Sequence, residues 1–207
     1  MTAVNFVFEP HQACIATDTL ITSRNPQHAS KILAMPHARC VVAFSGSLVI
    51  FADLAATLLA GCTANVEVLI QGMPRTLCDL RERWGGAIPP TSVYLLGVAA
   101  DDTIRVATFS SEADFVAATC WRPWTCYVSP MPAAQTATRP AVAESPAPAP
   151  PALARPMPGR WRDCVATILE AMHWQHRDNP DTIGGRIQCT YLTPGAIHQT
   201  WLGMLEE

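Results

Sequence analysis

A single lysine stands out among the basic side chains of this chain. Fourteen of its 207 residues are basic, and Lys31 is the only lysine among them. Codon bias in a GC-rich genome would explain why lysine is scarce, but not why one is present here. Arginine keeps its proton in proteins, whereas burial lowers the pKa of a lysine and lets it exchange protons. Lys31 is therefore a candidate for chemistry, although a lysine taken alone is most often a surface charge.

Thr2 has the side chain and the position for a second chemical role. Methionine is commonly removed before a residue as small as threonine, and this removal would expose the amine of Thr2. The unperturbed pKa of an α-amino group is about 7.7–8.0, so near pH 7 the amine can accept the proton of the Thr2 hydroxyl. Thr2 is thus a candidate N-terminal nucleophile, although threonine is commonplace at this position.

Asp18 and Gly46 have types and positions that suit the same chemistry. Asp18 ends an expected strand and would pair with Lys31, because an unpaired buried charge is costly. Gly46 lies between an apolar strand and an expected helix. Its N–H is therefore placed to donate to the oxyanion of a tetrahedral intermediate. Taken alone, an aspartate here is most often a turn residue, and a glycine a tight turn.

The hydrophobic pattern predicts the elements that would hold these residues. Strands and helices alternate in groups, and this order favours an α+β layered sandwich. Strands are expected at 3–8, 13–17, around 32–33, at 40–44, 92–99 and 103–109, near 115, and at 125–129, 186–192 and 196–202, with helices at 48–60, about 74–84 and 160–177.

The composition sets limits on compartment and partners. The net charge of −3 argues against nucleic acid or an anionic membrane as the main partner. No apolar run is long enough to span a bilayer, and no signal peptide is recognisable, so we expect a cytoplasmic protein. Six of the eight cysteines lie in apolar segments without paired spacing and are then expected to be buried, reduced thiols, with Cys120 and Cys126 as the likeliest exceptions.

One stretch differs in composition from the rest of the chain. Residues 130–160 include nine prolines and nine alanines, with almost no large apolar side chain. Such a segment buries too little surface to offset its ordering entropy. We therefore expect a single domain over 1–207 that a disordered Pro/Ala-rich insertion interrupts at 130–160.

The element order and the local motifs together resemble the proteasome β subunits and the bacterial proteasome-like heat-shock peptidase. The resemblance covers roughly 2–128 and 160–203. It implies an N-terminal nucleophile (Ntn) hydrolase with a four-layer αββα sandwich. The motifs that carry it are Thr2 at the first strand, Asp18 in Ala16-Thr17-Asp18, Thr22 four residues later, Lys31 in Ser30-Lys31-Ile32, and Gly46 in Phe44-Ser45-Gly46.

The same resemblance implies roles for other residues. Ser129 would bond the amine of Thr2. Thr22 would offer its backbone groups to an extended peptide that adds as a strand. The residues that it places near the specificity pocket are Ile21, Leu33, Phe44 and Leu48. It implies no cofactor and no metal.

The leading hypothesis is a threonine-type endopeptidase that acts on peptides within a self-compartmentalised homo-oligomeric ring. An ATP-dependent unfoldase is a candidate partner. One alternative is a non-catalytic ring or scaffold subunit of a larger assembly, such as a proteasome-like particle or a virion. Another is an Ntn amidohydrolase that acts on a small amide. Retention of Met1 would favour the scaffold.

Overall fold

The N-terminal hairpin lies at the centre of a six-stranded antiparallel sheet. The computed structural model describes residues 2–22, 27–61, 65–86, 88–130, 152–156 and 161–205, with the backbone alone at 152–156 and 161–163. The order of the sheet is β10-β9-β1-β2-β11-β12. Its strands are β1 (Val4–Glu9), β2 (Gln12–Asp18), β9 (Thr125–Ser129), β10 (Ala152–Pro156), β11 (Arg186–Thr193) and β12 (Ala196–Met204).

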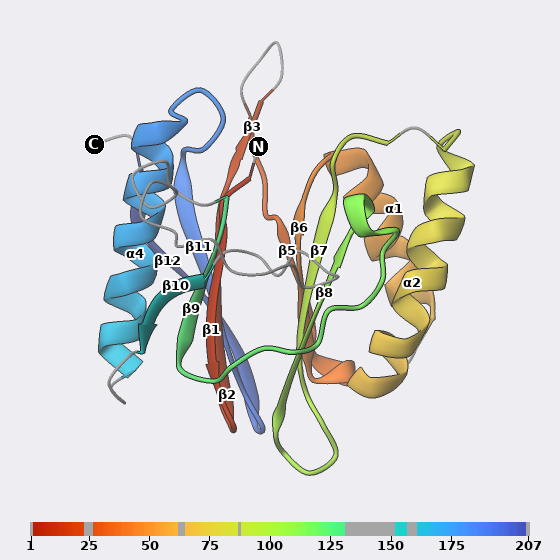
Figure 1. Cartoon of the computed structure of the whole chain (residues 1–207), viewed down its shortest axis with the longest axis horizontal. Helices are drawn as coiled ribbons and strands as arrows, with labels where there is room; N and C mark the ends of the chain where they lie inside the picture. The colour runs from red at the N-terminus through yellow and green to blue at the C-terminus, as the bar shows by residue number, and fades with distance from the viewer. Residues whose placement is uncertain are drawn as a thin grey trace.

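A second antiparallel sheet faces the first, in the order β5-β6-β7-β8 (Figure 1). Alternate residues of β6, such as Val41 and Ala43, point toward the first sheet, while Val42 and Phe44 point toward the helices. The strands of this sheet are β5 (Ile32–Met35), β6 (Cys40–Ser45), β7 (Ser92–Val98) and β8 (Ile104–Ser110), and β3 (Leu20–Ile21) pairs separately with β4 (Gln27–His28).

Helices lie on the outer sides of the two sheets (Figure 1). The helices α1 (Leu48–Ala60) and α2 (Val66–Arg83) pack on the four-stranded sheet, and α4 (Trp161–Asp178) packs on the six-stranded one. Two short 3-10 turns, η1 (Pro36–Ala38) and η2 (Ser111–Ala113), follow β5 and β8. Apolar clusters fill the space between the sheets and the space beneath each group of helices.

The expectation of a four-layer αββα sandwich is wrong. The described residues form mainly antiparallel sheet, with three α-helices, and α4 alone covers the outer side of the six-stranded sheet. Six strands about 4.8 Å apart span roughly 24 Å, whereas one helix with its side chains is about 10–12 Å wide. One helix therefore makes no complete outer layer, and the edge strand β12 is largely exposed beyond it.

The second helix begins earlier than its sequence predicts. Pro74, the expected first turn, lies inside α2. Asn65 caps the helix instead, because its side chain accepts hydrogen bonds from the N–H groups of Glu67 and Val68. The expected insertion at 130–160 lies mostly outside the described residues, but β10 falls within it and pairs with β9.

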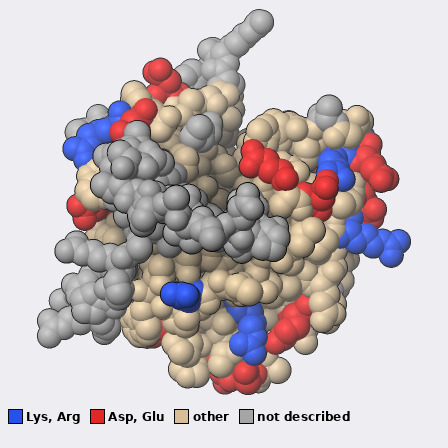
Figure 2. Space-filling view, in the orientation of Figure 1, with Lys and Arg blue, Asp and Glu red and all other residues tan. Residues whose placement is uncertain are grey.

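On the face in Figure 2, acidic and basic side chains are interspersed between wide areas of uncharged surface. Among the helices of the described residues, none is long and apolar enough to cross a membrane.

Candidate active site

A buried ion pair joins the end of β2 to the start of β5. Lys31 Nζ lies 3.0 Å from Asp18 Oδ2, and the side chains of the two residues are 7% and 0% exposed. Asp18 Oδ1 also accepts a hydrogen bond from the N–H of Ala3 at 2.9 Å, and Oδ2 accepts one from the N–H of Gly184 at 3.3 Å. Three donors thus surround one carboxylate, an arrangement that suits its ionised form.

Burial is the main influence on the titration of this pair. Burial raises the pKa of Asp18, and the Lys31 ammonium and the backbone donors oppose that rise. Burial likewise lowers the pKa of Lys31, against the attraction of Asp18. Lys31 therefore releases its proton more readily than an exposed lysine does.

Thr2 lies directly beside this pair. It precedes β1 and is 5% exposed, and the N–H of the next residue, Ala3, donates to Asp18. The carboxylate that binds Lys31 therefore also fixes the backbone at Thr2. Met1 lies outside the described residues.

Gly46 follows β6 in a conformation that requires glycine. Its φ is +142°, and a Cβ at this position would lie 2.8 Å from Thr91 Oγ1 and 3.2 Å from the ring of Phe44. Both the backbone conformation and the space exclude a side chain. The chain can therefore turn sharply from β6 into α1 and bring the backbone of Gly46 to the edge of the pocket that also contains Thr2.

That pocket has a volume of about 280 Å³ and is lined by most of the candidate site residues that the sequence indicated. Among the described residues that line it, Lys31 is the only one with a charged side chain, and the others are mainly apolar. Four lining residues that the sequence did not indicate are Leu20, Ser47, Val49 and Phe51. The full lining consists of Thr2, Leu20, Ile21, Thr22, Lys31, Phe44, Gly46, Ser47, Leu48, Val49 and Phe51.

Three of the expected residues are not part of this lining, and one of them, Asp18, lies behind it, bound to Lys31. Leu33 packs against the apolar cluster beneath α1 and α2. Ser129 pairs with Val4 across β9 and β1, and it faces Tyr94, where burial raises the pKa of the phenol and Ser129 opposes that rise. The bond from Ser129 to the amine of Thr2 stays a prediction.

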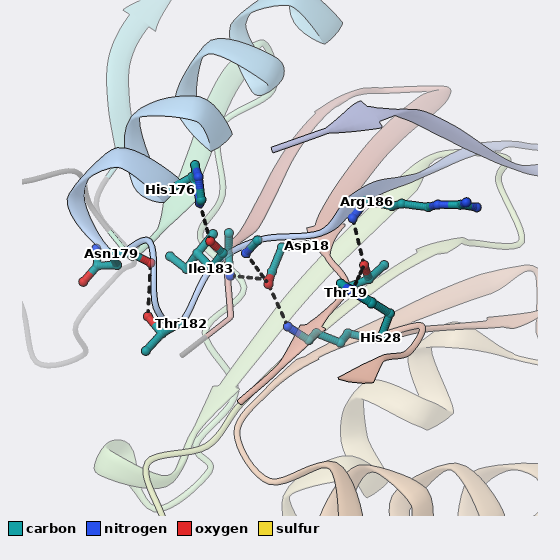
Figure 3. Close-up of polar contacts among 11 residues, drawn as sticks. Asp18, Thr19, His28, His176, Asn179, Thr182, Ile183 and Arg186 are labelled. Carbon is teal, nitrogen blue, oxygen red and sulfur yellow. Dashed lines mark hydrogen bonds and ion pairs between the residues drawn. The ribbon is translucent and has the colours of Figure 1, made fainter. Parts of the chain in front are cut away.

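The loop between α4 and β11 completes the surroundings of Asp18 (Figure 3). Gly184 reaches the carboxylate through its N–H, and the N–H of Arg186 donates to Thr19 Oγ1 at 3.0 Å. His28 Nδ1 is 3.3 Å from the same Thr19 oxygen. Sequence reasoning missed this loop, and its only signal was the Gly184-Gly185 pair, which allows a close approach of the backbone.

Comparison with known proteins gives structural likeness only. No family model and no curated protein matches the chain. Among solved structures, Anbu (Gly-1) mutant from Hyphomicrobium sp. strain MC1 aligns with a TM-score of 0.72 at 16% identity, over 98% of this chain and 87% of that one. Anbu (ancestral beta-subunit) from Yersinia bercovieri aligns at 0.71 and 12%, again over 98% and 87%. A further Anbu structure from the Hyphomicrobium strain aligns at 0.68 and 15%, over 98% and 88%.

These findings correct the resemblance inferred from the sequence motifs. Similar structures include those of Anbu, and no family model or curated protein connects the chain with the heat-shock peptidase. Short motifs such as a threonine four residues after an aspartate are too common to distinguish relatives that share a fold. At 12–16% identity, the likeness establishes that the chain has the fold of Anbu.

Proposed function

We propose that this protein is a threonine peptidase in which Thr2, once Met1 has been removed, is the nucleophile. One observation carries the proposal: a single pocket is lined by Thr2, Lys31 and Gly46, with Asp18 bound to Lys31 behind them. These residues come from the start of the chain, the position just before β5, the turn after β6 and the end of β2. An arrangement of a hydroxyl, a buried lysine and an unhindered backbone N–H is what acyl transfer from an amide requires.

The proposed reaction begins at the hydroxyl of Thr2. Its oxygen attacks the carbonyl carbon of the scissile bond, and its proton passes to the neutral α-amino group of the same residue. The Lys31 ammonium lowers the pKa of that amine and keeps it neutral near pH 7. The negative charge that develops on the carbonyl oxygen is stabilised by the N–H of Gly46.

The tetrahedral intermediate then collapses to an ester on Thr2. The carbon–nitrogen bond breaks, and the leaving amine takes the proton from the α-amino group. Water next attacks the ester and loses a proton to the amine, which restores the Thr2 hydroxyl and releases the carboxylic acid. Asp18 touches no reacting atom in this scheme, but it holds Lys31 at 3.0 Å and the backbone of Ala3 at 2.9 Å.

The lining of the pocket supports a neutral, apolar substrate side chain beside the scissile bond. Ile21, Phe44 and Leu48 offer apolar surface, and Phe51 stacks on Phe44 with ring centroids 5.2 Å apart. Among the described lining residues, a charged substrate side chain would lose its hydration without gaining an opposite partner, because Asp18 already compensates Lys31. Thr22 at the rim would pair its backbone with an extended peptide.

Self-association forms part of the same proposal. α1 buries one face against the sheet, yet Leu48, Val49 and Leu59 are 36%, 55% and 49% exposed. An exposed apolar helix face is typical of an interface between subunits. In a homo-oligomer, this face would be covered and the neighbouring pocket enclosed. Val49→Asp should therefore lower the mass that light scattering measures, and an unchanged mass would argue against this interface.

An active-site probe tests the peptidase directly. A peptide vinyl sulfone with an apolar residue next to the warhead should label the wild type, with the adduct on the N-terminal peptide in mass spectrometry. Thr2→Ala should not be labelled, whereas Thr200→Ala, an exposed threonine on β12, should be labelled like the wild type. Equal labelling of Thr2→Ala and wild type would reject the proposal. An unlabelled wild type that retains Met1 would favour the non-catalytic scaffold subunit.

A further inference from the structure

One peptide group links α4 to the carboxylate of Asp18. Ile183 contributes the carbonyl and Gly184 the N–H of this group. The N–H donates to Asp18 Oδ2 at 3.3 Å, and the carbonyl oxygen lies 2.5 Å from Nδ1 of His176, which is in the last turn of α4. Figure 3 shows the imidazole and the carboxylate on opposite ends of this peptide.

The contact defines which ring nitrogen of His176 carries a proton. A carbonyl oxygen can only accept a hydrogen bond, so Nδ1 must be the donor. A hydrogen bond to the oxygen of a peptide polarises the group and makes its N–H a stronger donor. The bond from His176 therefore acts on Asp18 through the peptide, although the imidazole itself does not contact the carboxylate.

Other bonds hold this peptide at a fixed angle. The N–H of Ile183 donates to Asn179 O at 3.0 Å, and the N–H of Leu20 donates to Gly184 O at 3.1 Å. Both Ile183 and Gly184 are buried, so water does not compete for their polar groups. Under these conditions, removal of the His176 bond leaves a buried carbonyl short of a donor and weakens the N–H that reaches Asp18.

We infer that His176 is a positioning residue for the Asp18–Lys31 pair. It orients and polarises the Ile183–Gly184 peptide, so that the peptide N–H supports the ionised carboxylate and, through it, the ammonium of Lys31. The catalytic consequence rests on the proposed function, whereas the chain of hydrogen bonds does not.

Two matched substitutions separate the hydrogen bond from the packing of the ring. His176→Phe keeps the ring and removes the donor, and His176→Asn places an amide N–H near the position of Nδ1. We expect kcat for an apolar peptide substrate to fall about two- to tenfold in His176→Phe, the range for loss of one hydrogen bond, with KM little changed. His176→Asn should stay close to the wild type. Equal kinetics of His176→Phe and wild type would overturn the inference.

Lys31 provides a readout that needs no activity. It is the only lysine, so ¹³C-labelled lysine gives one side-chain NMR signal. At low pH, this signal should respond to protonation of Asp18, which lies 3.0 Å away. Loss of the donor raises the pKa of Asp18, so the acid inflection should move to higher pH in His176→Phe and return toward the wild-type position in His176→Asn. Identical titrations of His176→Phe and wild type would overturn the inference even if no peptide is cleaved.

If a variant does not fold, the inference about His176 can still be tested on the wild-type protein. ¹⁵N-labelled histidine, with His176 assigned through His176→Asn or by sequential assignment, reports which ring nitrogen carries the proton in the neutral form. We expect Nδ1–H. If His176 is found as the Nε2–H tautomer, it cannot donate to Ile183 and the inference fails. An inactive wild type with the expected tautomer and titration would instead reject the proposed peptidase and leave this hydrogen-bond chain in place.

Discussion

The two ends of β2 both have ion pairs, but their surroundings differ. At the Asp18 end, a lysine and a carboxylate are almost fully buried, and backbone N–H groups satisfy the carboxylate. At the Gln12 end, the turns of the two sheets meet, and Arg39 pairs with Asp102 at 2.5 Å with side chains 38% and 59% exposed. Seven residues of strand, roughly 20 Å, separate the two ends.

The difference shows what burial does to the same kind of contact. Exposed pairs such as Arg39–Asp102 are screened by water and salt, and they contribute little to stability. The Asp18–Lys31 pair costs desolvation energy that its attraction offsets only in part, as the opposed pKa shifts of its two members indicate. A costly pair is more easily explained by chemistry than by stability, because apolar residues would fill the same space at least as well.

The largest effect on activity should come from the replacement of buried Lys31 with arginine. Lys31→Arg keeps the charge but introduces a planar guanidinium that is wider than the ammonium of a 6% exposed lysine and would displace the charge from Thr2. We expect turnover of an apolar peptide to fall about 10²- to 10⁴-fold, as for loss of a group that assists proton transfer. The fold should survive, as circular dichroism would show.

The exposed pair provides the matched control for this exchange. Arg39→Lys makes the reverse substitution at the other end of β2 and should leave turnover unchanged. Full activity of Lys31→Arg would show that Lys31 has no catalytic role. A similar loss of activity in both variants would mean that the effect is structural.

A smaller effect concerns stability. Asp18→Asn leaves Lys31 buried without a counter-charge, and we expect the free energy of unfolding in urea to fall by about 3–5 kcal/mol. Asp102→Asn should stay within about 1 kcal/mol of the wild type. The double variant Asp18→Asn/Lys31→Met should recover much of the loss, because no buried charge remains. A double variant no more stable than Asp18→Asn would contradict this account of the pair.

The sequence predicted the local part of this site better than its long-range part. α1 follows from an apolar run between Ser47 and Gly61, and the Asp18–Lys31 contact follows from the need of a buried charge for a partner. The contact of Gly184 with Asp18 joins residues 166 positions apart. It depends on the register of β11 against β2, which no pattern around Gly184 specifies.

The wrong expectations about the start of α2 and about the four layers also arose because contacts in the folded structure decide both features. Pro74 suggested a helix start, but the capping bonds of Asn65 and the burial of Leu69 and Met73 outweigh one lost hydrogen bond inside α2. The expectation of four layers was based on the order of the elements along the chain. That order does not tell how wide a six-stranded sheet is relative to one helix, because this width depends on how the strands assemble.

The smallest expected effect is a difference in sign between the pH dependences of the two ends. The pKa of buried Asp18 is raised, so the folded state binds more protons than the unfolded state between about pH 3.8 and the pKa in the folded state. Stability from this group therefore falls as pH rises through that window. The pKa of Lys31 is lowered, so the stability that it contributes rises again between its pKa in the folded state and about pH 10.5.

At the exposed end, hydrogen bonds from Thr103 lower the pKa of Asp101. The stability that Asp101 contributes is therefore present above about pH 3.8 and is lost as pH falls through the lowered pKa. Unfolding free energies across this range should therefore show a trough at intermediate pH for wild type minus Asp18→Asn/Lys31→Met. Wild type minus Asp101→Asn should decline only toward acid. Curves of the same shape for both differences would show that burial does not distinguish the two ends.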